Sequence, residues 1–288
     1  MQRFEFIAPS SLAEVLELLE RYGEGCRVVA GGTDIMPALR QGRLAGVARL
    51  VDIRRRQELR GMKITGDGLW IGAATTHSEV AQSDAVRDRW PLLAEACGKI
   101  GSKQIRNLAT VGGNVANASP AADSVPALLC LDARISLLSG HGKRELPLQS
   151  YLATKKRNAP AELVEGFTLP FPLPNTCGRF VKVARRQAMA ISRLSLAMVL
   201  HLDGDTVDFA RIVPGAMLAV PHHLERVEEY LVGKELTAEV SANAVKLVKE
   251  VVIAETGMRP SFKYKLPVLE GLVRRLFNQF REGEVGHG

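Results

Sequence analysis

The sequence is poor in aromatic residues and has no long apolar run. Aromatic residues make up 5% of the 288 residues, and no basic run is interleaved with aromatics as in segments that bind nucleic acid. We therefore expect no nucleic-acid partner, and we attribute the net charge of +7 to a solvated surface or to an acidic protein partner. No apolar run approaches the roughly 18 to 20 residues that cross a bilayer, so we expect no membrane span.

Cysteine is also scarce, and its spacing excludes the common local metal sites. The four cysteines, Cys26, Cys97, Cys130 and Cys177, are scattered and form no Cys-x-x-Cys pair, so we expect no metal ligands on this chain. Buried thiols in a reducing compartment are the simpler interpretation. The N-terminus lacks the apolar core of a signal peptide, which predicts a cytoplasmic location.

The usual nucleotide-binding glycine motifs are missing, but two other glycine pairs are present. Neither Gly-x-Gly-x-x-Gly nor a P-loop occurs. The first pair lies in Ala30-Gly31-Gly32-Thr33-Asp34 and the second in Thr110-Val111-Gly112-Gly113-Asn114. Each pair follows an extended stretch and could expose backbone N–H groups, which bind phosphate. Either pair alone predicts only a turn, whereas two pairs in one domain suggest a dinucleotide held between them.

The periodicity of the chain predicts three stretches, at residues 1–55, 56–172 and 175–288. In the first stretch, Ser11 and Glu14 form a capping-box pattern that begins a helix. Strands are expected at residues 4–7, 27–30 and 50–53, and a short second helix at residues 35–39. Together these elements form a small α/β unit.

The second stretch combines hairpins with a long segment of small residues. Two hairpins are expected at residues 62–72 and 133–148, around Gly66-Asp67-Gly68 and Gly140-His141-Gly142. Thr76 and Glu79 form another capping-box pattern, and a helix is expected at residues 92–100 after Pro91. Residues 104–123 show little periodicity and are expected to form a long loop packed against a ligand.

Prolines mark the boundary of the third stretch, at Pro170, Pro172 and Pro174. Three strands and then three helices are expected beyond it, at residues 179–185, 193–202, 207–213, 224–231, 238–255 and 264–280. This pattern predicts a small α+β C-terminal domain with a three-stranded sheet.

Five motifs occur in a fixed order along the chain: Ala30–Asp34, Gln104–Asn107, Thr110–Asn114, Ser119–Asp123 and Arg185–Ser192. Together they resemble the FAD-binding (medium) subunits of the molybdenum hydroxylases, a family that includes xanthine dehydrogenase and carbon monoxide dehydrogenase. The resemblance covers essentially the whole chain, including Ser261–Lys265 before the last expected helix. It implies an α+β architecture: a two-subdomain FAD-binding fold of the PCMH, or vanillyl-alcohol-oxidase-like, type followed by a small C-terminal domain.

The resemblance also implies where FAD binds. The first glycine loop would hold the pyrophosphate, and the second would approach the cofactor from the other subdomain, with Asn114 donating an amide hydrogen bond. The implied cofactor-binding residues are Arg27, Val28, Val29, Ala30, Gly31, Gly32, Thr33, Asp34, Ile35, Gly101, Ala109, Thr110, Val111, Gly112, Gly113, Asn114, Asn117, Asp123, Leu163, Val164 and Lys182.

For four of these residues the sequence leaves two interpretations open. Asp123 would accept a hydrogen bond from a ribose or ribityl hydroxyl, or it would cap the helix that follows. Lys182 would lie near the flavin ring, or it would be an exposed strand lysine. Leu163 and Val164 would pack on the cofactor or simply in the core.

The function that the resemblance implies is electron transfer within a larger complex. Substrate would be hydroxylated at the molybdenum cofactor of a large partner subunit, and electrons would pass through 2Fe–2S clusters of a small partner to FAD on this chain. They would leave to NAD or another acceptor, and no residue of this chain would be catalytic. Ala153 stands where xanthine dehydrogenases have a tyrosine, and the nearby Lys155-Lys156-Arg157 would suit an acidic carrier. The alternatives are a stand-alone FAD oxidoreductase and a cofactor-free scaffold.

Overall fold

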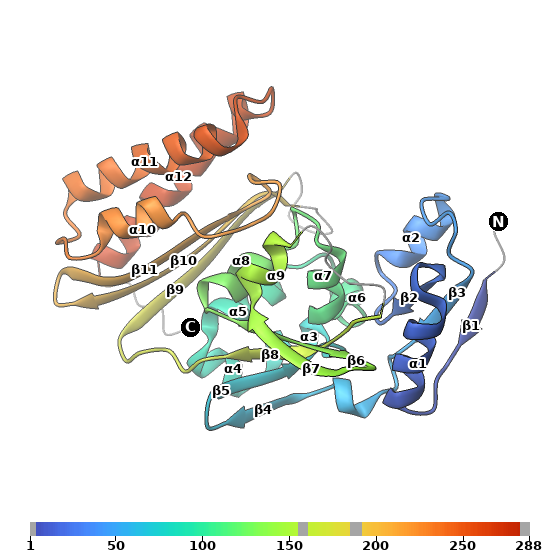
Figure 1. Ribbon diagram of the computed structural model, residues 1–288. Helices are drawn as coiled ribbons and strands as arrows, with labels where there is room; N and C mark the ends of the chain where they lie inside the picture. Colours follow the sequence, from blue (N-terminus) through green and yellow to red (C-terminus); the bar gives the residue numbers. More distant parts are fainter. Residues whose placement is uncertain (1–3, 155–160, 185–191, 283–288) are drawn as a thin grey trace. The chain divides into compact units, whose positions relative to one another are not determined.

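A computed structural model describes residues 4–154, 161–184 and 192–282, and the chain divides into two compact units (Figure 1). Unit 1 consists of Met1–Gln82, Ile100–Ser119 and Asp132–Phe171. Unit 2 consists of Ser83–Lys99, Pro120–Leu131 and Pro172–Gly288. Both units mix helices and sheets, which confirms the expected α+β class. The domain boundaries expected near residues 55 and 172–175 stay predictions.

The first sheet of unit 1 is small and parallel, with the strand order β1-β3-β2. Its strands are β1 (Glu5–Ile7), β2 (Cys26–Val29) and β3 (Arg49–Asp52), and all three were expected. Helix α1 (Leu12–Tyr22) begins where the capping box predicts, since Glu14 N–H donates to Ser11 Oγ at 3.1 Å. The Glu14 carboxylate, however, accepts from the backbone N–H of Ser10 at 2.6 Å rather than from Ser11.

The second sheet of unit 1 is antiparallel, with the strand order β4-β5-β8-β6-β7. Both expected hairpins are present, as β4 (Met62–Thr65) with β5 (Gly68–Gly72) and β6 (Arg134–Ser139) with β7 (Gly142–Pro147). The central strand β8 (Leu163–Leu169) was not expected. It pairs with β5 and β6, which lie far away in sequence, so no local turn signal points to it.

Short helices connect the strands of unit 1. They are α2 (Ile35–Arg40), α3 (His77–Gln82), α6 (Lys103–Arg106), α7 (Val111–Asn117) and α9 (Leu148–Ala153). The Thr76–Glu79 capping box is complete, because Glu79 Oε2 accepts from Thr76 N–H at 2.7 Å and Glu79 N–H donates to Thr76 Oγ1. The expectation of one long loop over residues 104–123 was wrong. Ser102 and Thr110 each accept a hydrogen bond that caps a short helix, and both helices are too short for a periodic pattern.

Unit 2 is built on the expected three-stranded antiparallel sheet, in the order β11-β10-β9. The strands are β9 (Thr176–Ala184), β10 (Ser192–Asp203) and β11 (Thr206–Gly215). A tight turn around Gly204, which has a φ of +60°, joins the last two strands. The helices of this unit are α4 (Asp84–Arg89), α5 (Pro91–Gly98), α8 (Ser124–Cys130), α10 (Glu225–Leu231), α11 (Ala238–Thr256) and α12 (Phe262–Arg281).

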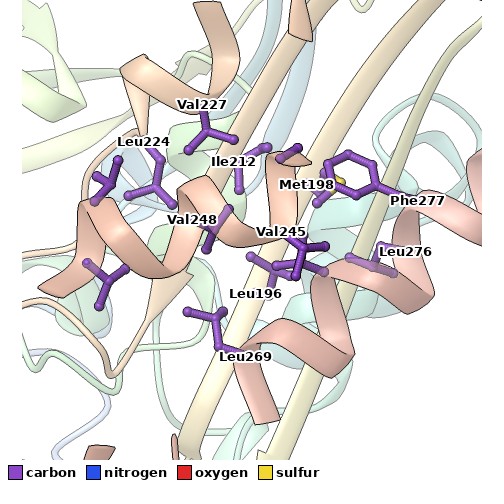
Figure 2. Close-up of a cluster of buried hydrophobic side chains, with 14 of the residues drawn as sticks. Leu196, Met198, Ile212, Leu224, Val227, Val245, Val248, Leu269, Leu276 and Phe277 are labelled. Atoms are coloured by element: carbon purple, nitrogen blue, oxygen red, sulfur yellow. The ribbon is translucent and has the colours of Figure 1, made fainter. Parts of the chain in front are cut away.

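Both faces of the unit 2 sheet are covered, and this explains the nearly continuous apolar sequence of β10. Helices α10, α11 and α12 cover one face (Figure 1), and α5 and α8 contact the strands as well. Figure 2 shows the apolar core between the sheet and the three C-terminal helices. Its labelled members are Leu196, Met198, Ile212, Leu224, Val227, Val245, Val248, Leu269, Leu276 and Phe277.

Three of the four cysteines are buried as expected, and Cys177 is half-buried. All four are free thiols. Among the residues that the structure describes, no helix combines the length and the apolar character that crossing a bilayer requires.

Two helical glycines should respond to alanine in opposite directions. A Cβ on Gly112 in α7 would lie 2.5 Å from Ala73 Cβ, whereas a Cβ on the exposed Gly271 in α12 would meet nothing within 4 Å. We expect Gly112→Ala to lower the free energy of unfolding by about 1–3 kcal/mol through overpacking. Gly271→Ala should raise it by about 0.5–1 kcal/mol through helix propensity. Urea unfolding of both variants tests this pair, and effects of the same sign would contradict it.

Candidate functional site

The first glycine loop connects β2 to α2 in unit 1, and its two glycines are needed for different reasons. A Cβ on Gly31 would lie 2.0 Å from the carbonyl oxygen of Leu108, so only glycine allows the two backbone segments to touch. Gly32 has a φ of +73°, the left-handed region that favours glycine. A Cβ on Gly32 would still have room, since its nearest neighbour would be Met36 Cγ at 3.5 Å.

This loop leaves a row of hydrogen-bond donors free. Within the described part of the chain, no group accepts a hydrogen bond from the backbone N–H of Gly31, Gly32, Thr33 or Asp34. Successive N–H groups of this kind form an anion-binding concavity. The first glycine loop therefore leaves its N–H groups without an acceptor in the described structure, as expected.

Asp34 is a carboxyl group at the end of this loop, directly before α2. It occupies the N-cap position of α2, but its side chain makes no capping hydrogen bond. Burial raises the pKa of the Asp34 carboxyl above its usual value.

The second glycine pair differs from the first, because the protein itself uses its N–H groups. The Val111 N–H donates to Thr75 O, and the Gly112 N–H donates to Ala73 O. The Gly113 N–H donates to Thr110 Oγ1 at 3.0 Å, and the Asn114 N–H to Thr110 O. The expectation of exposed N–H groups was thus wrong for this pair, since it lies inside α7 and its first turn is capped. The role of these residues toward a cofactor stays a prediction.

The two glycine segments are nevertheless neighbours. Gly31 lies against the carbonyl of Leu108 and the Cα of Ala109. The Ala109 carbonyl accepts from the His77 N–H at 3.0 Å, and Thr110 forms a β-bridge with Thr76. Unit 1 therefore brings the first glycine loop to the segment that begins the second pair.

Most of the other expected site residues of unit 1 lie in strands or helices around these segments. Arg27, Val28 and Val29 belong to β2, Ile35 begins α2, and Asn117 ends α7. Gly101 has a φ of +48°, and a Cβ there would lie 2.9 Å from Ile105 Cγ2.

Leu163 and Val164 are core residues of the central strand β8. Their exposed fractions are 3% and 7%, and they pair with Leu138 and Leu137 on β6. Leu163 packs in the apolar cluster that includes Val28 of β2. The structure therefore shows core packing for both residues. Contact of either side chain with a cofactor stays a prediction.

Asp123 and Lys182 form a buried ion pair inside unit 2. Lys182 Nζ lies 2.6 Å from Asp123 Oδ2, and the two side chains are 10% and 5% exposed. Ser192 Oγ also donates to the Asp123 carboxylate, and Lys182 donates to the carbonyl of Lys99 at 2.9 Å. Burial raises the pKa of Asp123, and the charge and hydrogen bond of Lys182 oppose that rise.

For each of these two residues the structure excludes one of the interpretations that the sequence left open. The Asp123 side chain does not cap α8, so the capping interpretation was wrong. Lys182 is not an exposed strand lysine either, because nearly all of its side chain is covered. A contact of either residue with a cofactor stays a prediction.

His77 is a buried polar residue whose burial the sequence did not reveal. Its side chain is fully buried, and neither ring nitrogen has a hydrogen-bond partner in the described structure. Burial, with a smaller contribution from the Arg106 charge, lowers the pKa of His77 to about 3. The capping box placed this residue at a helix start, but no local signal indicates that its ring faces the core.

Comparison with known proteins places this arrangement in a family. Residues 2–172 match the family described as FAD binding domain in molybdopterin dehydrogenase, and residues 179–280 match the CO dehydrogenase flavoprotein C-terminal domain. The chain belongs to the FAD-binding (medium) subunits of the molybdenum hydroxylases. It carries the FAD-binding domain of such a subunit and is therefore part of an oxidoreductase.

Individual relatives extend over nearly the whole of this medium subunit. The chain is 31% identical over 284 residues to the nicotinate dehydrogenase FAD-subunit of Eubacterium barkeri, with 96% of each chain covered. It is 29% identical to the carbon monoxide dehydrogenase medium chain of Hydrogenophaga pseudoflava, again with 96% of each covered. A chain of the reconstituted CO dehydrogenase from Oligotropha carboxidovorans superposes with a TM-score of 0.87 at 28% identity, covering 96% of this chain and 97% of that one.

The donor set of the medium subunit fits FAD. The first glycine loop offers consecutive free N–H groups for a pyrophosphate, and the Thr33 hydroxyl adds a further donor. The structure does not describe the basic Lys155-Lys156-Arg157 or residues 185–191 of the Arg185–Ser192 motif.

Replacing His77 should make the medium subunit less sensitive to acid. The unfolded chain protonates histidine below a pKa of about 6.5, whereas the folded state resists protonation of His77 down to a pKa of about 3. Stability is therefore lost as the pH falls through this window, by ~1.4 kcal/mol per pH unit. His77→Leu should remove roughly 2 kcal/mol of the loss between pH 6.5 and pH 5. Urea unfolding at these pH values is the measurement. The exposed His141→Gln serves as the control, and equal acid sensitivity of His77→Leu and wild type would contradict the prediction.

Removing Lys182 should leave a buried, unpaired carboxylate. We expect Lys182→Met to lower the free energy of unfolding by about 3 kcal/mol at pH 7 in flavin-stripped protein. Without Lys182 the pKa of Asp123 rises further, so protonation at lower pH should restore part of the lost stability. The double variant Lys182→Met with Asp123→Asn should be more stable at pH 7 than Lys182→Met alone. A double variant no more stable than the single variant would contradict the coupling.

Proposed function

We propose that this chain binds FAD, with the first glycine loop holding the pyrophosphate, and transfers electrons within a molybdenum hydroxylase complex. Electrons arrive from 2Fe–2S clusters of a small partner subunit and leave from FAD to NAD or another acceptor. The large partner subunit carries the molybdenum cofactor and hydroxylates the substrate. The observation that carries this proposal is the row of free N–H groups from Gly31 to Asp34.

Each part of the loop contributes a distinct property to cofactor binding. Gly31 allows contact with Leu108 and so fixes the loop against the next segment. Gly32 supplies the left-handed backbone conformation within the loop. The bound FAD supplies the redox chemistry, and the protein binds and orients it.

The second glycine segment packs against the first glycine loop. Its N–H groups are bonded to Ala73 and Thr75, so it serves as a wall against which the first loop rests. We propose that Asn114 and Asn117 of α7 contribute their side-chain amides to the cofactor, as their family position implies. Asp123 and Lys182 would act as a neutralised pair, with the lysine adjusting the charge near the flavin.

The names of the relatives support the proposed division of labour. One relative is named an FAD-subunit and another a medium chain, which are parts of larger enzymes. A subunit that only relays electrons needs no group that touches the organic substrate. The acceptor, NAD or an acidic carrier, and the cytoplasmic location belong to the same proposal.

Two glycines with the same backbone geometry provide a matched test of the cofactor site. Gly32 and Gly42 both have left-handed φ values, +73° and +67°, and neither would create a steric clash closer than 3.5 Å. We expect Gly32→Asp to weaken FAD binding at least about tenfold, because its carboxylate would repel the pyrophosphate. Gly42→Asp should leave FAD binding within about twofold.

The measurement is the flavin absorbance of the purified variants, followed by identification of the flavin released on denaturation. Wild-type protein should release FAD, and reconstitution of stripped protein gives the affinities. A wild-type chain that takes up no FAD would overturn the proposed function. Equal losses in the two variants would show that the first glycine loop acts only as a turn.

A further inference from the structure

We propose that a cluster of cations in unit 2 binds a phosphate-bearing ligand other than FAD. The cluster consists of Arg193 of β10, Arg259 before α12, and Lys263 and Lys265 of α12, and we call it the C-terminal cation cluster. The exposed Tyr264 lies between the two lysines in sequence. The proposal goes beyond the proposed function, because neither the first glycine loop nor electron transfer requires this cluster.

The four cations have no counter-ion of their own. None of them pairs with a carboxylate among the residues that the structure describes. No carboxylate is near them in sequence either, since residues 166–202 and residues 256–269 contain no aspartate or glutamate. Cations without a counter-ion create a positive potential that attracts an anion.

Both arginines of the cluster lie over aromatic rings of α12. Arg193 Cζ lies 5.1 Å from the centre of the Tyr264 ring, and Arg259 Cζ lies 5.8 Å from the centre of the Phe262 ring. Cation–π attraction holds a guanidinium at such a distance. These contacts bring a strand residue and the segment before α12 to the first residues of the helix.

A backbone carbonyl holds the Lys265 ammonium group. Lys265 Nζ donates to Ala216 O at 2.6 Å, and the Ala216 N–H donates to Pro120 O at 2.7 Å. Ala216 has a φ of +59°, a left-handed conformation that is unfavourable for a residue with a Cβ. Strained residues of this kind are concentrated at binding and catalytic sites.

An anion would relieve the repulsion inside the C-terminal cation cluster. Burial lowers the pKa of Lys265, and the positive charges of Arg259 and Arg193 lower it further. These charges therefore act on one another, and no carboxylate of the described structure pairs with them. A bound phosphate would compensate several of them at once.

The side chains fit a phosphate group better than an acidic protein surface. Arginine binds phosphate through two parallel N–H groups, and lysine binds it as a point charge. Tyr264 is 45% exposed and offers a ring on which a nucleobase stacks. A protein partner requires a broad interface with an apolar centre, whereas the cluster consists of four charged side chains and one exposed ring. A nucleotide and free pyrophosphate share the chemistry that the cluster recognises.

The test reverses one charge in the cluster and one charge elsewhere in unit 2. Arg259→Glu is compared with Lys246→Glu, since both residues are exposed, lie in unit 2 and give the same change in net charge. Pyrophosphate and ADP are titrated by calorimetry into the flavin-loaded chain after removal of free FAD, so that FAD already occupies its own site. FAD content and melting temperature are recorded for each variant.

We expect wild-type protein to bind both probes, with an affinity that falls as salt rises and a melting temperature that rises with probe concentration. Arg259→Glu should weaken binding of both probes at least about tenfold. Lys246→Glu should leave both affinities within about twofold, and both variants should retain FAD.

Tyr264→Leu distinguishes the two sources of the phosphate group. For a nucleotide site, this variant should bind ADP at least about fivefold more weakly, because the stacking ring is lost, and pyrophosphate as wild type does. Unchanged binding of both probes assigns the cluster to a phosphate group without a base. Both results support the phosphate site and differ only in the ligand that carries the phosphate.

Three results would overturn the proposal. The first is wild-type protein that binds neither probe. The second is an equal loss in Arg259→Glu and Lys246→Glu, which would show that net charge alone attracts the probes. The third is loss of FAD from Arg259→Glu, which would show that the cluster belongs to the FAD site. Wild-type protein without FAD contradicts the proposed function instead, and the same titrations then apply to that chain.

Discussion

The contact between Gly31 and the Leu108 carbonyl is the constraint on which the candidate site depends. Two backbone segments approach so closely there that any side chain on Gly31 would overlap the carbonyl. The contact fixes the first glycine loop against the segment that begins α7 without using the N–H groups of the loop. These donors stay available for an anion because the packing is achieved through the missing side chain rather than through hydrogen bonds.

The same principle separates the two glycine pairs. At Gly112 the missing side chain allows contact with Ala73, but there the N–H groups also bond to neighbouring carbonyls. The first glycine pair thus leaves its N–H groups free within the described structure, whereas those of the second pair are bonded by the protein itself. A motif of two glycines is compatible with either role, and only its surroundings select one.

Each unit buries a titratable side chain, but the two side chains differ in whether neighbouring groups satisfy their hydrogen bonds. Asp123 is buried with a lysine and a serine that satisfy it, so its charge is kept inside unit 2. His77 is buried in unit 1, and neither ring nitrogen has a hydrogen-bond partner among the described residues, so burial favours its neutral form. The first arrangement retains an ionic pair, and the second makes the fold sensitive to acid.

The sequence by itself determined the features that depend on near neighbours. The capping residues Thr76 and Glu79, the glycine turns and the strands of both hairpins follow from interactions within a few residues, and they were predicted correctly. The ordered motifs also indicated the family and its cofactor. Tertiary structure decided the rest: strand β8 between β5 and β6, the pairing of Asp123 with Lys182 across 59 positions, the burial of His77 and the use of the second loop's donors. These features depend on which distant segments pack together, and no local pattern carries that information.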